Sequence, residues 1–419
     1  MAAGKGAGAG ACQSGQTALA ARLLVRLAAG ATAGGRNLIF SPLSIHVALA
    51  LMSAGASGPT LDEILAVAGA PSREALMEFV AGAMVGRVLA DRSGAGGPCV
   101  AFACGAWTDR RRPLKPAYRD TIVGKFKGNA SNVDFLDHPI ESRKQINAWV
   151  AEATRGLISE LVNPYEQRRA TVNVVVNAIY FRGEWRDPFK NENTVDREFH
   201  RLDGSSVDVP FMQSWSNQLI VCHDGFKVLK LPYKVMGDEA SQGFNWKQWQ
   251  SIPKFSMCVF LPNAKDGLPG LVEKMTSSPG FLHNHLPVKS VAVGNFRLPR
   301  FKLAFGGSIV EDLQSLGLLL PFDPLGHRMT EMVEDDATDG PIYVADVIHK
   351  AVVDVNEEGS EAAAATESDD DMGFSLYDDY EPPKPVDFVA DHPFAFFIME
   401  ETSGAIIFAG HVLDPSKEE

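Results

Sequence analysis

Residues 349–366, HKAVVDVNEEGSEAAAAT, change character halfway along their length. The first part, 351–356, carries valines on both faces of an extended chain, which is typical of a strand buried inside a sheet. The second part has one face made only of small residues, namely Ser360, Ala362, Ala364 and Thr366. Its other face consists of Glu361, Ala363, Ala365 and Glu367. The segment therefore joins a buried strand to a chain with one small-residue face.

Two interpretations of the second part stand side by side. Residue types alone favour an alanine-rich loop or one turn of helix, because alanine is the best helix former. A face of small residues is also what a segment needs if it is to slip between two strands of an existing sheet. The flanks support this second interpretation, because a buried-type strand precedes the segment and the acidic, proline-containing stretch 367–385 follows it.

The segment closely resembles the proximal hinge of the serpins, a family in which the hinge feeds an exposed reactive loop that is bait for a protease. Three further stretches resemble serpins in the family's order: NLIFSPLSIHVALALMSAGASG at 37–58, TVNVVVNAIYFRGEW at 171–185 and VDFVADHPFAFFIMEETSGAIIFAGHVLDP at 386–415. The likeness runs from about residue 23 to 415, and the string VDFVADHPF is most similar to plant-type serpins.

The resemblance implies an α+β, single-domain fold in which three β-sheets are surrounded by about nine helices and a reactive loop is exposed. We expect residues 1–16 to be a flexible N-terminal tail, 17–415 to be the serpin domain, and 416–419 to be a C-terminal tail. The hinge and reactive loop occupy 359–386. The hinge residues that the resemblance implies are Glu357, Glu358, Gly359, Ser360, Glu361, Ala362, Ala363, Ala364, Ala365 and Thr366.

The implied function is that of a suicide-substrate inhibitor of a serine protease, or alternatively of a cysteine protease. The target would attack the loop and form an acyl-enzyme, after which the hinge would insert as a new central strand. The usual family distance from the hinge glycine places the cut at Gly373–Phe374. Because glycine is a poor specificity residue, other residues of the loop are alternatives. They are Met372, Phe374, Leu376 and Tyr377 for a chymotrypsin-like target and Asp371 for an Asp-directed one.

Two more sets of residues take their roles from the resemblance. Ser41, Ser44, Asn177 and His349 match the "shutter", which lies beneath the point where the central sheet opens. Trp185 and Arg300 match the "breach" at the top of the sheet, and Arg300 is expected to pair with Glu357. Without the family, Ser41 and Ser44 are ordinary capping and packing residues, and Trp185 is a core aromatic. Cys104 departs from the family, which usually has asparagine at that position.

Composition limits the other classes of function. The chain has 419 residues, of which 45% are hydrophobic and 22% charged, enough for a sizeable core. Its net charge of −13 argues against a nucleic-acid partner. No stretch is long and apolar enough to cross a membrane, and the N-terminus lacks the features of a signal peptide. The five cysteines, an odd number, favour free thiols in a reducing compartment.

We therefore expect a cytoplasmic monomer, with the nucleus and the extracellular space as alternatives, whose partner is the target protease. No catalytic motif, cofactor motif or convincing metal site is present, and His283 and His285 on one strand face are a weak metal signal. The alternative function is a non-inhibitory serpin with a carrier, chaperone or storage role. The alanine run argues against it, because such members often carry bulky or charged hinge residues. The stretch 235–252 is interpreted as a surface insertion without an assigned role.

The remaining periodicities predict individual elements. Helices are expected at 17–27, ended by Gly30, Gly34 and Gly35, and at 44–54, 142–161 and 309–316. Strands are expected at 38–40, 102–108, 172–181, 296–303, 342–347, 394–399 and 405–412. Pro299 should bend or break its strand. Continuing the alternation along the hinge places Asp370 on the inward face with the small residues.

Overall fold

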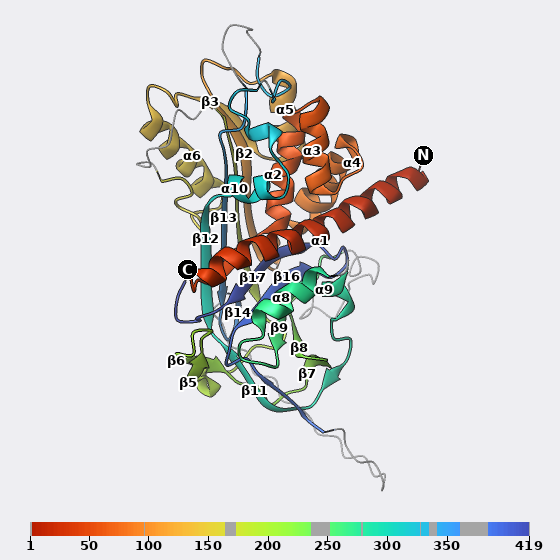
Figure 1. Ribbon diagram of the computed structural model, residues 1–419, viewed down its shortest axis with the longest axis vertical. Helices are drawn as coiled ribbons and strands as arrows, with labels where there is room; N and C mark the ends of the chain where they lie inside the picture. The colour runs from red at the N-terminus through yellow and green to blue at the C-terminus, as the bar shows by residue number, and fades with distance from the viewer. Residues whose placement is uncertain are drawn as a thin grey trace.

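Three β-sheets make the framework of the computed structural model (Figure 1), which describes residues 2–95, 97–163, 173–235, 252–277, 280–326, 328–334, 342–360 and 384–418. The long central sheet has six strands, in the order β12-β13-β4-β2-β3, with β14 paired to β4 outside that order. They are β12 (Phe301–Ser308), β13 (Asp346–Val355), β4 (Asn173–Glu184), β2 (Cys99–Asp109), β3 (Asn129–Val133) and β14 (Gly359–Ser360). Its two middle strands, β13 and β4, run parallel.

The other two sheets are built mainly of antiparallel pairs. The seven-stranded sheet has the order β1 (Leu38–Phe40), β17 (Ile406–Val412), β16 (Phe394–Glu400), β9 (Phe255–Pro262), β8 (Phe226–Pro232), β7 (Gln218–His223) and β10 (Ser290–Val291). The four-stranded sheet has the order β15 (Val386–Val389), β11 (Val293–Pro299), β6 (Ser206–Met212) and β5 (Val195–His200).

Nine α-helices lie around the sheets in the described part of the chain. They are α1 (Ala2–Ala33), α2 (Pro42–Gly55), α3 (Gly58–Ala68), α4 (Arg73–Glu78), α5 (Pro116–Phe126), α6 (Pro139–Ala153), α8 (Leu268–Thr276), α9 (Phe281–Asn284) and α10 (Val310–Ser315). A π-helix, η1 (Phe79–Val88), continues α4, and short 3₁₀ turns occur at η2 (Ser93–Ala95), η3 (Asn191–Asn193) and η4 (Leu320–Phe322). Figure 1 shows α1 running obliquely across the molecule, with α2 to α5 above it and α8 and α9 below it.

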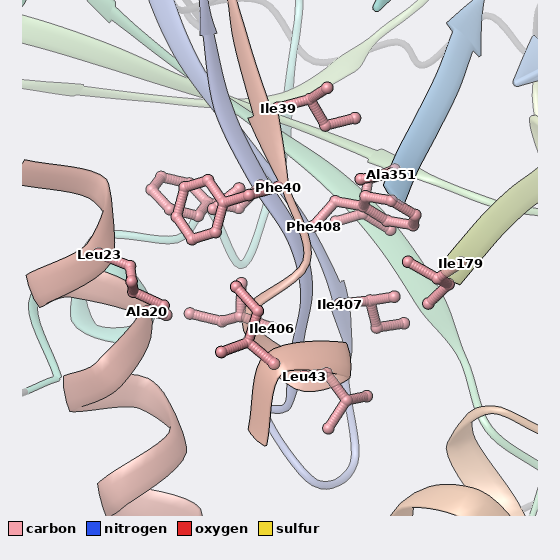
Figure 2. Packing of buried hydrophobic residues seen from close by; sticks show 14 of the residues in the cluster. Ala20, Leu23, Ile39, Phe40, Leu43, Ile179, Ala351, Ile406, Ile407 and Phe408 are labelled. Carbon is pink, nitrogen blue, oxygen red and sulfur yellow. The ribbon is translucent and has the colours of Figure 1, made fainter. Parts of the chain in front are cut away.

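The central strand β4 is buried on both of its faces. Val175, Ile179 and Phe181 belong to the main core, whereas Val174, Val176, Ala178 and Tyr180 belong to a second apolar cluster that includes residues of α6. Figure 2 shows part of the main core, where side chains of α1, β1, α2 and β17 meet Ile179 of β4 and Ala351 of β13. Burial on both faces explains the run of valines in β4, because a strand without a solvent face needs no polar alternation.

The first turn of α2 brings two serines to the central sheet. Ser41 is the N-cap residue, and its Oγ accepts a hydrogen bond of 3.1 Å from the backbone N–H of Ser44. Pro42 stands at the first helical position, where its missing N–H leaves no bond unmade. The Ser-Pro pair thus sets the start of α2 at Pro42, two residues before the start expected at Ser44.

Residues 2–16 of the expected flexible tail lie in helix α1, which begins at Ala2. Cys12 and Gln16 are buried, and the Gln16 side chain binds β17 through Nε2 to the Ile406 oxygen at 2.8 Å. Tertiary contact therefore supports a helix that the glycine-rich composition alone does not predict. Gly30 lies inside α1 rather than ending it, and the chain turns at Gly35, where φ is +61°.

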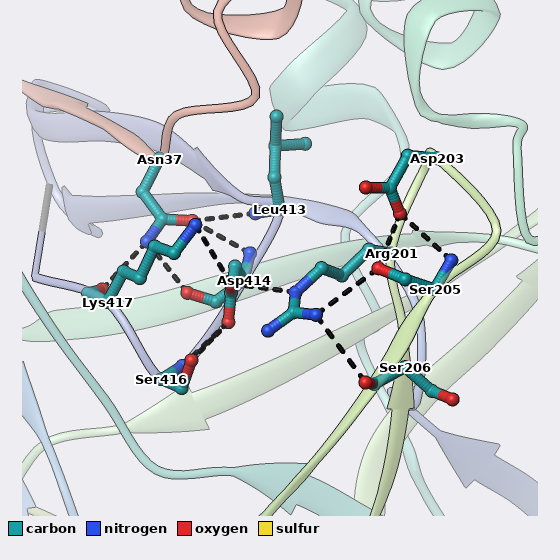
Figure 3. A network of polar contacts seen from close by, with 9 residues as sticks. All are labelled: Asn37, Arg201, Asp203, Ser205, Ser206, Leu413, Asp414, Ser416 and Lys417. Carbon is teal, nitrogen blue, oxygen red and sulfur yellow. Dashed lines mark hydrogen bonds and ion pairs between the residues drawn. The ribbon is translucent and has the colours of Figure 1, made fainter.

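The expected C-terminal tail, 416–419, is tied to the body of the protein over its described residues (Figure 3). Asn37 donates its Nδ2 to the backbone oxygens of Asp414 and Lys417, each at 2.8 Å. The Asp414 carboxylate accepts from Arg201 Nε at 2.7 Å. The residues just after the last strand are therefore held by both charged and backbone contacts.

The helix expected at 142–161 is α6, and it ends at Ala153. Arg155 and Gly156 take positive φ values of +53° and +81°, which end the helix. The segment that follows folds back onto α6, because Asn147 donates Nδ2 to the Val162 oxygen at 2.7 Å and accepts from the N–H groups of Leu161 and Val162 at 3.0 and 2.9 Å.

Other boundaries differ in instructive ways. The strand expected at 296–303 is two strands, β11 and β12, which are separated at Arg300 directly after Pro299, as the break predicted at the proline requires. The strand expected at 342–347 begins only at Asp346. His283 lies in the short helix α9, not in a strand, and it contacts the Gly404 oxygen at 2.9 Å. The five cysteines are all unpaired.

Candidate functional site

The line between β4 and β13 is where the central sheet would have to open. The two parallel strands pair in register from Asp346 opposite Val174 to Val352 opposite Tyr180. Beyond Tyr180, β4 continues to Glu184 without pairing with β13. The pairing therefore covers residues 174–180 of β4 and leaves the β13-side edge of its last residues free for another partner.

The four predicted shutter residues meet across this line. His349 of β13 stands opposite Asn177 of β4, and its Nδ1 lies 2.5 Å from Asn177 Oδ1. Ser44 Oγ donates to the same oxygen at 2.7 Å. The backbone N–H of Ser41 reaches His349 Nε2 at 3.0 Å. Since all four residues are fully buried, α2 and the two strands share one buried polar cluster.

The Ser41 contact fixes the protonation state of His349. A backbone N–H can only donate, so Nε2 must be the acceptor and Nδ1 must carry the proton. That proton requires an acceptor, which sets Oδ1 rather than Nδ2 of Asn177 toward His349. Burial lowers the pKa of His349 to about 3, so the ring is neutral at physiological pH.

The Asn177 amide is only half satisfied. Its Oδ1 accepts from both His349 and Ser44, whereas Nδ2 has no partner among the described residues. On the other side of β4, Cys104 of β2 stands directly opposite Asn177. The Cys104 thiol is directed to the Phe126 oxygen at 3.8 Å instead. Cys104, where the serpin family usually has asparagine, thus stands opposite a buried amide whose Nδ2 has no partner among the described residues.

The predicted breach residue Trp185 holds the turn that follows β13. Its Nε1 donates to the Asn356 oxygen at 2.9 Å, and its backbone N–H donates to the Glu358 oxygen at 2.8 Å. Its ring stacks on Tyr233, with ring centroids 4.5 Å apart. The Asn356 side chain closes the same turn by accepting from the N–H groups of Glu358 and Gly359 at 3.1 and 3.3 Å.

The Arg300–Glu357 pair forms as expected. Arg300 Nε donates to Glu357 Oε1 at 2.6 Å, and its NH2 group contacts the same oxygen. Thr194 Oγ1 also donates to that oxygen, and Asn191 accepts from Arg300 at 3.2 Å. The Glu357 side chain is only 4% exposed, whereas that of Arg300 is 40% exposed. The carboxylate at the start of the hinge is therefore buried and relies on its partners.

The chain reverses direction after this turn and begins a new strand. Gly359 and Ser360 form β14, which pairs antiparallel with β4 through Gly359 opposite Glu184 and Ser360 opposite Gly183. The short strand also contacts β13, so it lies on the β13 side of β4. The first two small hinge residues thus occupy the free end of β4.

The other predicted site residues lie outside the described residues. They are Glu361, Ala362, Ala363, Ala364, Ala365 and Thr366 of the hinge and Asp371, Met372, Gly373, Phe374, Leu376 and Tyr377 around the reactive bond. The stretch 235–252 is described only at its two ends. Four residues of the site were not predicted, namely Thr194, Asn191, Asn356 and Tyr233. Only Asn356 carries a local signal, since asparagine before Glu-Glu-Gly favours a turn.

The chemistry available at this site is that of a strand acceptor rather than of a catalyst. Within the described ranges, no group of three metal-ligating side chains is found. In the same ranges, no helix has the length and apolarity needed to cross a membrane. The shutter and breach instead consist of neutral hydrogen bonds and one ion pair that hold two parallel strands and a turn in place.

Comparison with known proteins adds to this geometry. A family model described as "Serpin (serine protease inhibitor)" matches residues 14–415. The chain is 47% identical to Serpin-Z2A and 46% identical to Serpin-Z2B of Oryza sativa subsp. japonica, over 97% and 98% of its own length and 98% and 99% of theirs. A solved structure of Arabidopsis AtSerpin1 in its native stressed conformation matches with a TM-score of 0.84 and 36% identity, covering 97% of this chain and 98% of that one.

Proposed function

The chain belongs to the serpin family, and on that premise we propose that it inhibits a serine or cysteine protease by inserting its cleaved reactive loop into the central sheet. The family is one of protease inhibitors and not of enzymes. The observation that carries the proposal is β14, because the first hinge residues already pair with β4 on the β13 side. Insertion would extend this existing pair.

The register of β14 supplies the path of the inserted strand. Continued from Ser360 opposite Gly183, it sets Ala362 opposite Phe181, Ala364 opposite Ile179 and Thr366 opposite Asn177. The side chains of directly opposed residues share one face. In β4, Phe181 and Ile179 belong to the main core, so the small hinge residues would enter on the core side of the sheet. This agrees with the alternation of the hinge sequence.

Insertion supplies the free energy for trapping. The new strand would form ladder bonds to both β4 and β13, and each bond contributes about 1 kcal/mol net. About a dozen such bonds, with the burial that accompanies them, can exceed the stability of about 5–15 kcal/mol of an ordinary domain. The native state must then be metastable, and the description of the Arabidopsis relative as a native stressed conformation supports this.

We propose that the scissile bond is Gly373–Phe374. The alternatives, which depend on the target, are a cut after Asp371, Met372, Phe374, Leu376 or Tyr377. The partner is the target protease, and the inhibitor acts as a monomer. The five unpaired cysteines support a reducing compartment such as the cytoplasm.

The experiment is incubation with a panel of serine and cysteine proteases, read on a denaturing gel. A protease that cleaves the loop should give a complex that resists SDS. The matched variant Ala362→Arg should fold normally but become a substrate, because insertion would bury a long cation among core residues. Clean cleavage of the parent without a complex would instead favour the non-inhibitory alternative. Trapping by Ala362→Arg with the parental stoichiometry would contradict insertion along this register.

A further inference from the structure

The unpaired Nδ2 of Asn177 destabilises the closed sheet. Asn177 is 0% exposed, and a buried amide that forms no hydrogen bond destabilises the state in which it occurs. Its orientation is not free to change while the shutter is formed, because the protonated Nδ1 of His349 requires Oδ1 as acceptor. The hydrogen bonds of the shutter therefore keep Asn177 Nδ2 in the position where it has no partner.

Cys104 is the neighbour that fails to satisfy this amide. His349 and Cys104 flank Asn177 in register on either side, through β13 and β2. Directly opposed residues of an antiparallel pair point to the same face with Cβ atoms about 4.5–5.5 Å apart, so a side chain at 104 is within reach. A thiol is only a weak acceptor, and the Cys104 thiol faces the Phe126 oxygen.

We propose that Cys104 is a positioning residue that speeds the opening of the sheet between β4 and β13, because it leaves Asn177 unpaired in the closed sheet. The inference rests on the proposed insertion mechanism and deepens it. When β13 moves away, His349 no longer holds the Asn177 amide, and its Nδ2 can turn toward water or the incoming strand. Opening therefore relieves a penalty that the closed state carries.

Substitution by asparagine should remove the penalty. In Cys104→Asn, the new side-chain oxygen can accept from Asn177 Nδ2 while the new Nδ2 donates to the Phe126 oxygen that the thiol now faces. The first bond lies within the β2–β4 pair and the second joins β2 to the last residue of α5, so neither crosses the line where β4 and β13 would separate. The closed sheet gains stability, and opening no longer removes the free-energy penalty of an unpaired amide.

The test measures sheet opening without any protease. The parent, Cys104→Asn and Cys104→Ala are compared for the rate of self-association on mild heating and for the uptake of a synthetic peptide with the sequence of residues 360–372. Cys104→Asn should slow both rates about five- to thirtyfold, the factor expected for one satisfied buried group. Cys104→Ala removes the thiol but leaves the amide unpaired, so it should not slow them. Equal rates in the asparagine and alanine variants would overturn the inference.

A second measurement separates this role from general packing. The guanidinium midpoint is determined for intact protein and for protein nicked once in the loop. Cys104→Asn should raise the midpoint of the intact form more than that of the nicked form, since only the intact form has the closed shutter. An equal rise in both forms would refute the role in opening. If the asparagine variant does not fold, Cys104→Ser replaces it, because a hydroxyl can also accept a hydrogen bond from Asn177 Nδ2. Rates of self-association and peptide uptake equal to those of the parent would then count against the inference.

These outcomes are independent of protease trapping. A parent that traps a protease, together with unchanged opening rates in Cys104→Asn, would refute the role of Cys104 and leave the proposed function standing. If Cys104→Asn opens more slowly but the parent traps no protease, the inhibitory function is refuted, whereas the role of Cys104 in sheet opening stands.

Discussion

Gly359 lies against the backbone of Gly183, so that a side chain at position 359 would clash with the Gly183 oxygen. Its φ of +153° is also one that residues with side chains rarely adopt. Both constraints come from the pairing of β14 with β4. We expect Gly359→Ala to displace β14 from β4, to speed hydrogen exchange at Ser360 and to raise the stoichiometry of inhibition. Gly204→Ala is the control, because φ there is +82° but no atom crowds the site. Unchanged exchange at Ser360 would contradict this account of the hinge.

The Arg300–Glu357 pair should contribute to stability because one member is buried. In Arg300→Ala, Glu357 keeps Thr194 but loses its charged partner, and we expect a loss of about 1–3 kcal/mol in the free energy of unfolding. Lys302→Ala is the matched control, since the Lys302–Glu418 pair is exposed on both sides and such pairs contribute about 0–1 kcal/mol. Denaturant unfolding measures the stability of both variants. Equal losses in the free energy of unfolding would show that burial of Glu357 does not strengthen the pair.

Local chemistry predicted those parts of the molecule that local contacts determine. The valine runs indicated β4 and β13, and the apolar periodicity at 44–54 indicated most of α2. Contacts such as Ser41 with His349, which are 308 residues apart, were expected only through the resemblance to serpins. The start of α1 and the end of α6 were predicted wrongly, because contacts of Gln16 and Asn147 with distant or back-folded segments decide them. The sequence around Thr194 did not indicate a site residue, because its role is the hydrogen bond to Glu357, which is distant in the sequence.

Asn147 should hold the segment after α6 against the helix. Its side chain makes three hydrogen bonds to the backbone of Leu161 and Val162, and the residue is buried. In Asn147→Ala those backbone groups lose their partners, and we expect about 3 kcal/mol of destabilisation. Leu161 and Val162 also belong to the apolar cluster that covers β4, so insertion should become faster. Lys144→Ala on the same helix is the comparison. A variant that unfolds like the parent would show that the segment is held by apolar contacts alone.

Stability should fall as the pH falls below the pKa of an unfolded histidine. Burial lowers the pKa of His349 to about 3 and that of His46 and His411 to about 4. The unfolded chain then binds protons from about pH 6.5 downward, whereas the folded protein does not until about pH 4. The free energy of unfolding is therefore largest above pH 6.5 and should decline by about 1.4 kcal/mol per pH unit for each such histidine.

The variant His349→Gln tests this assignment, because glutamine can accept from Ser41 and donate to Asn177 without titrating. Its free energy of unfolding should decline less steeply between pH 6.5 and 5 than that of the parent. His138→Gln is the control, since Asp134 raises the pKa of His138 and its contribution has the opposite sign. A decline of parental steepness in His349→Gln would mean that His349 is not the neutral shutter residue described above.

Asp370 is the residue of the loop that insertion should oppose most strongly. The register of β14 sets it opposite Asn173, at the far end of β4 and on the core face. Asn173 is 0% exposed, and its Oδ1 has no partner among the described residues. A carboxylate brought there would be desolvated, so its pKa would rise above the value near 3.9 of an aspartate in water. The inserted state would bind the proton more tightly, which favours insertion as the pH falls through the raised pKa and opposes it above.

Asp370→Asn should therefore lower the stoichiometry of inhibition at neutral pH, because an amide can donate to Asn173 Oδ1 without carrying a charge. Glu361→Gln removes the same charge from the loop and is the matched control. Its register partner is Arg182, which is exposed, so Glu361 keeps access to water after insertion. Asp369 is less suitable as a control, since its partner Val174 is buried in the cluster with α6. The measurement uses one protease that cuts at Met372 or beyond, at pH 7.5 and 5.5. The advantage of Asp370→Asn over the parent should shrink at the lower pH, and equal stoichiometries for Asp370→Asn and Glu361→Gln would show that the register does not continue to Asn173.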